Sequence, residues 1–134
     1  MILFIAGAVA AAAALLTIAL SRNPIGSAAL AAALFGGFAA FTAVTIWSEG
    51  LMLVVENHTI NLWGIQVWYD LLLSVGIALF FIAPRARKAG MQVLPWIVLV
   101  ALTASIGLLA MVARLFWLEA QHTIDSAGAE RDTA

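Results

Sequence analysis

The stretch Ile2–Leu20, ILFIAGAVAAAAALLTIAL, contains no charged residue and no proline. A helix needs about 20 mainly apolar residues to cross the hydrocarbon core of a bilayer. The whole chain has the same character: of its 134 residues, 65% are hydrophobic and only 10% are charged, and its mean hydropathy is +1.10. Soluble domains are about half apolar and about a quarter charged. The sequence therefore predicts an integral membrane protein whose first span is this stretch.

Three further apolar stretches are long enough to cross a membrane. We expect an all-α, polytopic protein with one four-helix transmembrane domain over residues 1–118 and a mobile polar tail over residues 119–134. The predicted spans are residues 2–20, 25–47, 62–83 and 92–118. Barrel strands alternate over roughly ten residues, whereas these runs are continuous and about twice as long. The first stretch is expected to be retained, because no basic region precedes it as in a signal peptide.

Composition excludes several classes of function. The net charge of −1 provides no basic surface for nucleic acid. Without cysteine the chain has no disulfide, no thiolate metal site and no cysteine nucleophile, and we predict no metal site at all. The two histidines, His58 and His122, lie outside the predicted spans, so we expect no cofactor ligated by this chain alone. Contact with a pigment, quinone or lipid remains open. Sequence motifs for acyl transfer, zinc hydrolysis and nucleotide binding are absent, and no catalytic residue is predicted.

The positions of the basic residues predict the orientation. Basic residues fall in the first and third connections: Arg22, Arg85, Arg87 and Lys88. The positive-inside rule places these connections in the cytoplasm and both termini outside, in a bacterial inner membrane. These cations are also candidates for contact with lipid head groups. The predicted outer interface then carries Trp47, Trp63, Trp68 and Trp117, and the inner one Trp96.

The segment Ser48–Asn61 is the least regular part of the pattern. Its short apolar run, Leu51–Val55, stands between Glu49 and Glu56. Three conformations remain open, namely an extension of the second span, a re-entrant segment, or a segment lying along the outer surface. We favour the last, because about five apolar residues cannot cross a membrane.

Small side chains at helical spacing predict close helix packing, since apolarity alone gives no preference for protein over lipid. The first span carries such a stripe at Ala6, Ala10 and Ala14. The second carries Ala28, Ala32, Gly36 and Ala40. We therefore expect these two spans to pair tightly.

Two ionisable residues fall inside the predicted spans, Asp70 in the third and Arg114 in the fourth. Charged residues within spans are rare and pair or have a function. A polar stripe of Gln66, Asp70 and Ser74 would face a stripe of Gly107 and Arg114 on an antiparallel neighbour, which predicts an intramembrane Asp70–Arg114 ion pair. We favour a structural clamp, and a proton-handling role for Asp70 is the alternative.

Residues 68–114 resemble a widespread family of small bacterial membrane proteins, which is distantly similar to the plant membrane proteins needed to make neoxanthin. The resemblance is carried by Asp70, by the run Arg85–Met91 (RARKAGM) and by Arg114. The chain departs from the family where an acidic residue usually precedes the basic turn. It departs again where a Gly-Pro or Leu-Pro step usually interrupts the last helix. The resemblance implies a membrane protein connected with carotenoid chemistry.

We expect a non-catalytic accessory subunit that packs against a larger respiratory or photosynthetic membrane complex and helps to assemble or organise it. Its partners would be the lipid bilayer and other membrane subunits, and not nucleic acid. An enzyme or enzyme helper acting on a carotenoid or other isoprenoid is the alternative that the resemblance implies. A small homo-oligomeric transporter is a weaker third alternative, because only one acid lies within the spans.

Overall fold

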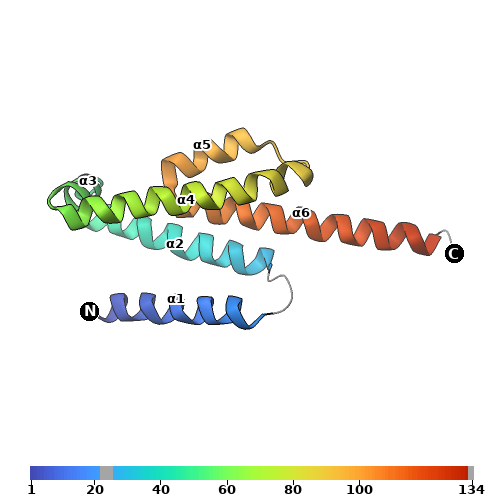
Figure 1. Cartoon of the computed structure of the whole chain (residues 1–134), viewed down its shortest axis with the longest axis horizontal. Helices are drawn as coiled ribbons and strands as arrows, with labels where there is room; N and C mark the ends of the chain where they lie inside the picture. The colour runs from blue at the N-terminus through green and yellow to red at the C-terminus, as the bar shows by residue number, and fades with distance from the viewer. Residues whose placement is uncertain (22–25, 133–134) are drawn as a thin grey trace.

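The computed structural model describes residues 1–21 and 26–132, with side chains described as far as residue 124. This part of the chain is helical throughout, with short connections (Figure 1). The helices run in the order α1 (Ile2–Leu20), α2 (Ala28–Glu49), α3 (Met52–Thr59), α4 (Leu62–Lys88), α5 (Val93–Thr103) and α6 (Ser105–Asp132). Arg22 and the predicted start of the second span at Ile25 lie outside the described residues.

Three of these helices, α1, α2 and α4, are long and apolar enough to cross a membrane. The predicted all-α class is therefore confirmed, as is the capacity of these stretches to span. Polar caps begin two of the helices: the Ser27 Oγ accepts a hydrogen bond from the Leu30 N–H at 3.2 Å, and the Asn61 Oδ1 accepts one from the Gly64 N–H at 2.8 Å. α4 continues through Pro84, beyond the predicted end of the third span at Ala83.

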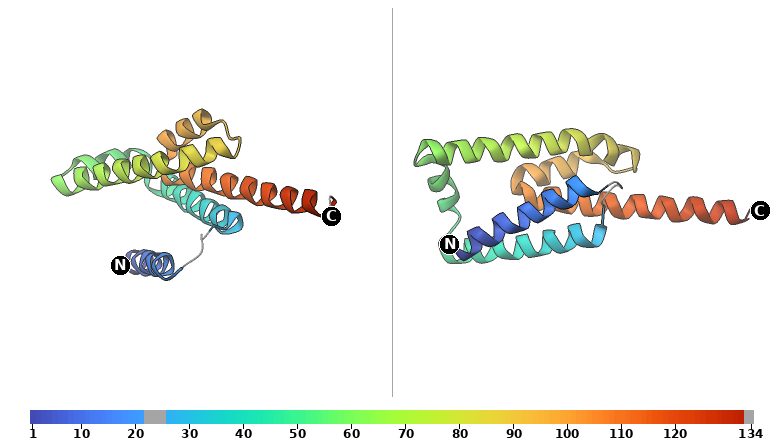
Figure 2. Two further views of the ribbon diagram at one scale, coloured as in Figure 1. Left: turned by 45° about the vertical axis from the view of Figure 1, so that its right-hand side comes forward. Right: turned by 60° about the horizontal axis from the view of Figure 1, so that its bottom comes forward.

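The long helices have two chemically different ends (Figures 1 and 2). We call the end that contains Arg85, Arg87 and Lys88, at the end of α4, the basic end. The opposite end contains Glu49 at the end of α2 and Glu56 on α3, and we call it the acidic end. The short helix α3 connects α2 to α4 across the acidic end and packs against α4. It is a separate helix between two helices that are long and apolar enough to cross a membrane.

The predicted fourth span, residues 92–118, is not one helix. α5 ends at Thr103, the chain turns at Ala104, and α6 returns along α5 towards the basic end (Figure 1). Eleven residues of α5 rise only about 16 Å, about half the thickness of a hydrocarbon core. Within the described residues, three helices are therefore long and apolar enough to cross a membrane, and residues 92–118 form parts of two helices that meet in a hairpin.

Close packing between α5 and α6 explains the reversal. A Cβ atom on Gly107 would lie 2.7 Å from the Thr103 Oγ1, 2.8 Å from the Val100 N and 2.9 Å from the Leu99 C. Only glycine allows the first turn of α6 to lie this close to the last turns of α5. Ala104 has a φ of 49° and a ψ of −116°, a sparsely populated conformation that costs about 1–3 kcal/mol for a residue with a side chain. Contact along the hairpin offsets that cost.

A second glycine ends α4 at the basic end. Gly90 has a φ of 78°, the Met91 N–H donates to the Ala86 carbonyl at 2.9 Å, and the Gly90 N–H donates to the Arg87 carbonyl at 3.0 Å. These two bonds make a Schellman motif, which satisfies carbonyls at the end of a helix. The motif also folds Met91 over Ala86, and both side chains are buried. This turn starts the return of the chain into α5.

The apolar core lies near the basic end, where α4, α5 and α6 meet. It contains Ala83, Ala86, Ala89, Met91, Val93, Met111 and Leu115. α2 packs along α6, antiparallel to it. In contrast, α1 buries none of its residues and lies apart from the other helices (Figure 1). The predicted tight pairing of the first two spans is therefore not formed.

Reversal of the chain at Ala104 also changes the predicted positions of later residues. Residues 119–132, predicted as a mobile tail, continue α6 as helix. Trp117 lies near the basic end together with Trp96, whereas Trp47, Trp63 and Trp68 lie towards the acidic end. The last described residues project at the basic end, opposite the N-terminus (Figure 2).

Gly107→Ala is expected to destabilise the hairpin by about 1–3 kcal/mol, because the added methyl group overpacks its contact with α5. Gly36→Ala is the matched control. A Cβ at Gly36 meets nothing within 4 Å, and helix propensity favours alanine there by about 0.5–1 kcal/mol. Unfolding of both variants in detergent micelles measures the difference. Equal stability of the two variants would contradict the close packing of α5 and α6.

Reporter fusions should place the two termini on opposite sides of the membrane. Because the basic residues at the end of α4 favour the cytoplasm, the C-terminal end of α6 is expected there and Met1 outside. Green fluorescent protein after Ala134 should fluoresce, and alkaline phosphatase there should be inactive. An active phosphatase at that position would show that α6 crosses the membrane, contrary to the hairpin.

Candidate functional site

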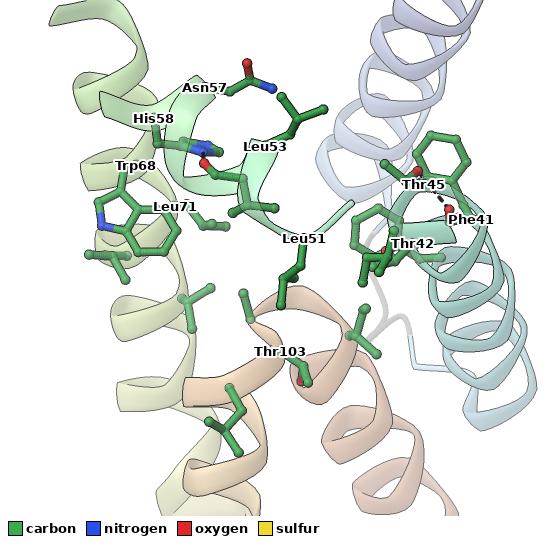
Figure 3. A pocket seen from close by; sticks show the side chains of 18 of the residues that line it. Phe41, Thr42, Thr45, Leu51, Leu53, Asn57, His58, Trp68, Leu71 and Thr103 are labelled. Carbon is green, nitrogen blue, oxygen red and sulfur yellow. Dashed lines mark hydrogen bonds between the residues drawn. The ribbon is translucent and has the colours of Figure 1, made fainter. Parts of the chain in front are cut away.

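A cavity of about 590 Å³ lies towards the acidic end of the molecule (Figure 3). We call it the acidic-end cavity. Its sides are the C-terminal part of α2, helix α3 and the N-terminal half of α4, and the tip of the α5–α6 hairpin closes it on a fourth side. The hairpin stops half-way along the other helices, and the cavity occupies the space beyond its tip.

Most of the lining is apolar, and several polar lining groups already have partners. The Thr45 hydroxyl donates to the Phe41 carbonyl at 2.9 Å, and the Thr103 hydroxyl donates to the Leu99 carbonyl at 2.7 Å. These bonds satisfy the hydroxyl donors within their own helices. Polar groups left to face a ligand are concentrated on α3 and at the end of α2.

His58 is fixed between α3 and α4. Its Nδ1 lies 2.6 Å from the Val54 carbonyl oxygen, and its ring meets Trp68 edge-on with centroids 5.3 Å apart. A carbonyl only accepts, so Nδ1 carries the proton, and in the neutral ring Nε2 is then the nitrogen that accepts. α3 approaches α4 so closely that a Cβ on Gly64 would clash with the Asn57 carbonyl. His58 therefore presents a fixed hydrogen-bond acceptor at the cavity.

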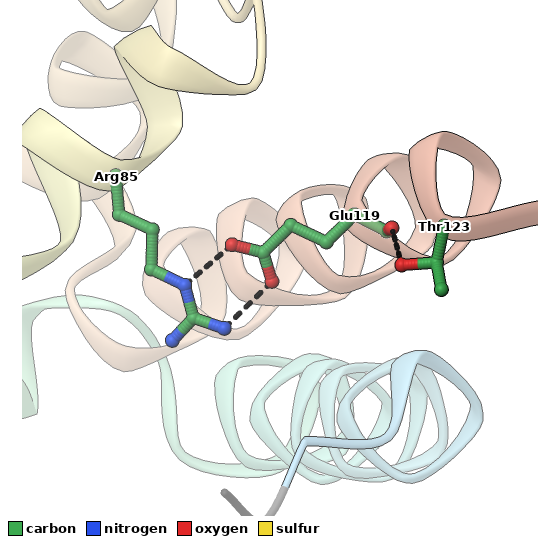
Figure 4. Close-up of polar contacts among 3 residues, drawn as sticks. All are labelled: Arg85, Glu119 and Thr123. Carbon is green, nitrogen blue, oxygen red and sulfur yellow. Dashed lines mark hydrogen bonds and ion pairs between the residues drawn. The ribbon is translucent and has the colours of Figure 1, made fainter. Parts of the chain in front are cut away.

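An ion pair that the sequence did not indicate lies at the basic end (Figure 4). Arg85 of α4 donates to both carboxylate oxygens of Glu119 on α6, at 2.5 Å from Nε and 2.6 Å from Nη2. The Arg85 guanidinium also lies 5.3 Å from the centre of the Phe116 ring. Reversal of the chain at Ala104 is what brings these positions together. Glu119 falls in the predicted polar tail, and no neighbouring residue in the sequence indicates that it has an ion-pair partner.

The predicted Asp70–Arg114 ion pair is not formed. Arg114 lies beside the turn that contains Gly90 and Gln92, with its guanidinium 4.3 Å from the centre of the Trp117 ring. Asp70 lies on α4, eight residues from its N-terminal end at Leu62, towards the other end of the molecule. The prediction assumed that Arg114 followed a full crossing of the membrane, but the hairpin returns it to the basic end.

Asp70 is exposed on the side of α4 that faces away from the bundle. It shares a surface hollow with Trp63, Gln66 and Tyr69, all from the same helix. Ser74, one turn further along, is exposed as well. Among the described residues, Asp70 has no ion pair and no hydrogen bond from a side chain. The predicted polar stripe therefore exists as a surface of α4 and has no partner within the described chain.

The stripe of small residues on α2 is also mostly open. Ala28 is half-buried, but Ala32, Gly36 and Ala40 are exposed. Helix α6 packs instead on the face of α2 that contains Ala31, which is buried. Arg87 and Lys88 are exposed at the end of α4, in positions compatible with contact to lipid head groups.

No protein-family model, curated protein or solved structure matches the chain in comparisons with each of these sets. Within the described residues, no three acidic or histidine side chains come together in a group that could hold a metal ion. The two features with open chemistry are the acidic-end cavity and the exposed carboxylate of Asp70.

Cysteine cross-linking can test the arrangement cleanly, because the chain contains no cysteine of its own. The pair Arg85→Cys with Glu119→Cys should be joined by a short bifunctional thiol reagent in membranes, since these side chains are in contact. Asp70→Cys with Arg114→Cys is the matched pair and should not be joined. Mass spectrometry of digested protein identifies the linked peptides.

Loss of the ion pair itself should not unfold the first variant. The side chains of Arg85 and Glu119 are 53% and 32% exposed, and exposed pairs contribute only about 0–1 kcal/mol. Cross-linking of the second pair without the first would mean that residues 92–118 cross the membrane as one helix.

Proposed function

We propose that the protein is a non-catalytic accessory subunit that docks, through the exposed face of α4 that contains Asp70, against a larger complex in a bacterial inner membrane. A single observation carries the proposal. Asp70 is an ionisable residue on a membrane-crossing helix, exposed, and without an ion-pair partner among the described residues. Within membranes such residues face protein or water and pair with other groups.

The position of Asp70 makes lipid an unfavourable neighbour. It lies about 12 Å along α4 from Leu62, at 1.5 Å per residue. An aspartate at the centre of a membrane helix costs roughly 2.5–3.5 kcal/mol on insertion scales, and less towards the interface. A partner helix presenting a cation or hydrogen-bond donors at this depth would remove that cost. The amide of Gln66 and the hydroxyl of Tyr69 adjoin Asp70 and enlarge the polar surface.

Helix α1 supports the same proposal independently. It is 19 residues long, buries none of them, and carries the small residues Ala6, Ala10 and Ala14 on one face. In a bilayer, small residues allow close approach of a neighbouring helix, whereas large apolar ones gain nothing over lipid. The open glycine and alanine positions on α2 have the same property. Surfaces suited to helix contact are therefore left free on both sides of the molecule.

Asp70→Asn tests the proposal by removing the charge while preserving the shape of the side chain. After mild detergent extraction, wild-type protein should co-purify with other membrane subunits in fixed stoichiometry. With the variant, the amount of co-purified subunits should be at least about tenfold lower, which corresponds to about 1.4 kcal/mol of binding free energy. Glu56→Gln is the matched control, since it neutralises an exposed acid outside the membrane-crossing helices. Quantitative mass spectrometry of the purified samples gives the ratios.

The amount of variant protein in the membrane must be measured alongside. Because Asp70 contacts no other helix, Asp70→Asn is expected to leave that amount unchanged. Wild-type protein that purifies alone, or only with copies of itself, would contradict the proposal. Equal co-purification of the wild type and the Asp70 variant would exclude this face of α4 as the docking surface.

A further inference from the structure

We infer that the acidic-end cavity binds the apolar chain of an amphiphile whose head group donates hydrogen bonds and carries no negative charge, such as a long-chain alcohol or amine. This goes beyond the proposed docking function, which uses the opposite side of α4.

The walls suit a hydrocarbon chain. A volume of about 590 Å³ lies within the range of roughly 300–1,000 Å³ that small-molecule sites occupy. Leu71 and Val75 of α4, Phe38 and Phe41 of α2, and Val100 and Ile106 of the hairpin contribute apolar surface. The tip of the hairpin is fixed by its packing around Gly107, so the cavity is part of the fold.

The polar groups at the cavity accept hydrogen bonds. Glu49, at the end of α2, offers a carboxylate, which when ionised only accepts. His58 offers the Nε2 lone pair, because its Nδ1 proton is already donated to Val54. The amide of Asn57 adds an acceptor and donors. A hydroxyl or ammonium head group matches this set.

The distribution of charge argues against an anionic head group. No lysine or arginine whose side chain the structure describes lines the cavity, since Arg85, Arg87, Lys88 and Arg114 all lie towards the basic end. A phosphate or sulfate placed beside Glu49 would face a like charge with no cation to compensate. Binding of an ordinary anionic lipid is therefore disfavoured at this site, whereas an amine would pair with the carboxylate.

Matched photoreactive probes test the inference. The full chain in phosphatidylcholine nanodiscs would be labelled with hexadecanol or with hexadecyl phosphate, each bearing a diazirine at the same carbon. Hexadecanol should label peptides from the end of α2, from α3 and from the hairpin tip at least about tenfold more than the phosphate does, a difference of about 1.4 kcal/mol in binding. Unlabelled hexadecylamine should compete with it.

Two variants separate the cavity from general adsorption to the protein. Ala101→Trp places a large side chain at a lining position and should abolish the labelling. Ala43→Trp is the matched control, at an exposed alanine of α2 that does not line the cavity, and should leave labelling unchanged. Glu49→Lys should reverse the preference, so that hexadecyl phosphate labels more strongly than hexadecanol.

Several results would overturn the inference. These are equal labelling by the two probes in the wild type, labelling that persists in the Ala101 variant, or labelling spread over α1 and the outer face of α4. None of them depends on Asp70 or on a partner subunit, so they leave the proposed docking function untouched.

Discussion

The close contact between α5 and α6 at Gly107 determines the architecture of the molecule. Because backbone of α5 occupies the space where a side chain at this position would lie, the two helices can run side by side directly after the turn at Ala104. α6 then reaches the basic end, packs on α2, and brings Glu119 to Arg85. The core between α4, α5 and α6 and the cavity beyond the tip of the hairpin both depend on this arrangement.

The sequence predicts the part of the fold that depends on local properties. Continuous apolar runs indicate α1, α2 and α4, and the polar residues between them indicate the connections. The hairpin could not be predicted in the same way, since the mainly apolar residues 92–118 have the length of one span or of two shorter helices. No proline or glycine pair marks the turn at Ala104. Gly107 becomes informative only when α5 is placed against it.

The candidate site, too, could be predicted from the sequence only in part. Asp70 stands out in the sequence as an acid within a span, but its environment depends on which helices face it. The predicted partner, Arg114, is placed elsewhere by the turn at Ala104. Glu49 and His58 lie in a short segment between spans, where surface residues are the rule. Only the folding of α3 against α4 shows that they line a cavity.

The hairpin gives the molecule a larger cross-section towards the basic end than at the acidic end. Towards the basic end, α5 and α6 lie beside α2 and α4, whereas neither α5 nor α6 extends beyond the tip of the hairpin to the acidic end. In a bilayer, such a wedge-shaped body displaces more lipid at the basic end than at the acidic end. An apolar chain bound in the acidic-end cavity would fill part of the space beyond the tip of the hairpin. Binding of such a chain would then depend on the lateral pressure of the surrounding bilayer.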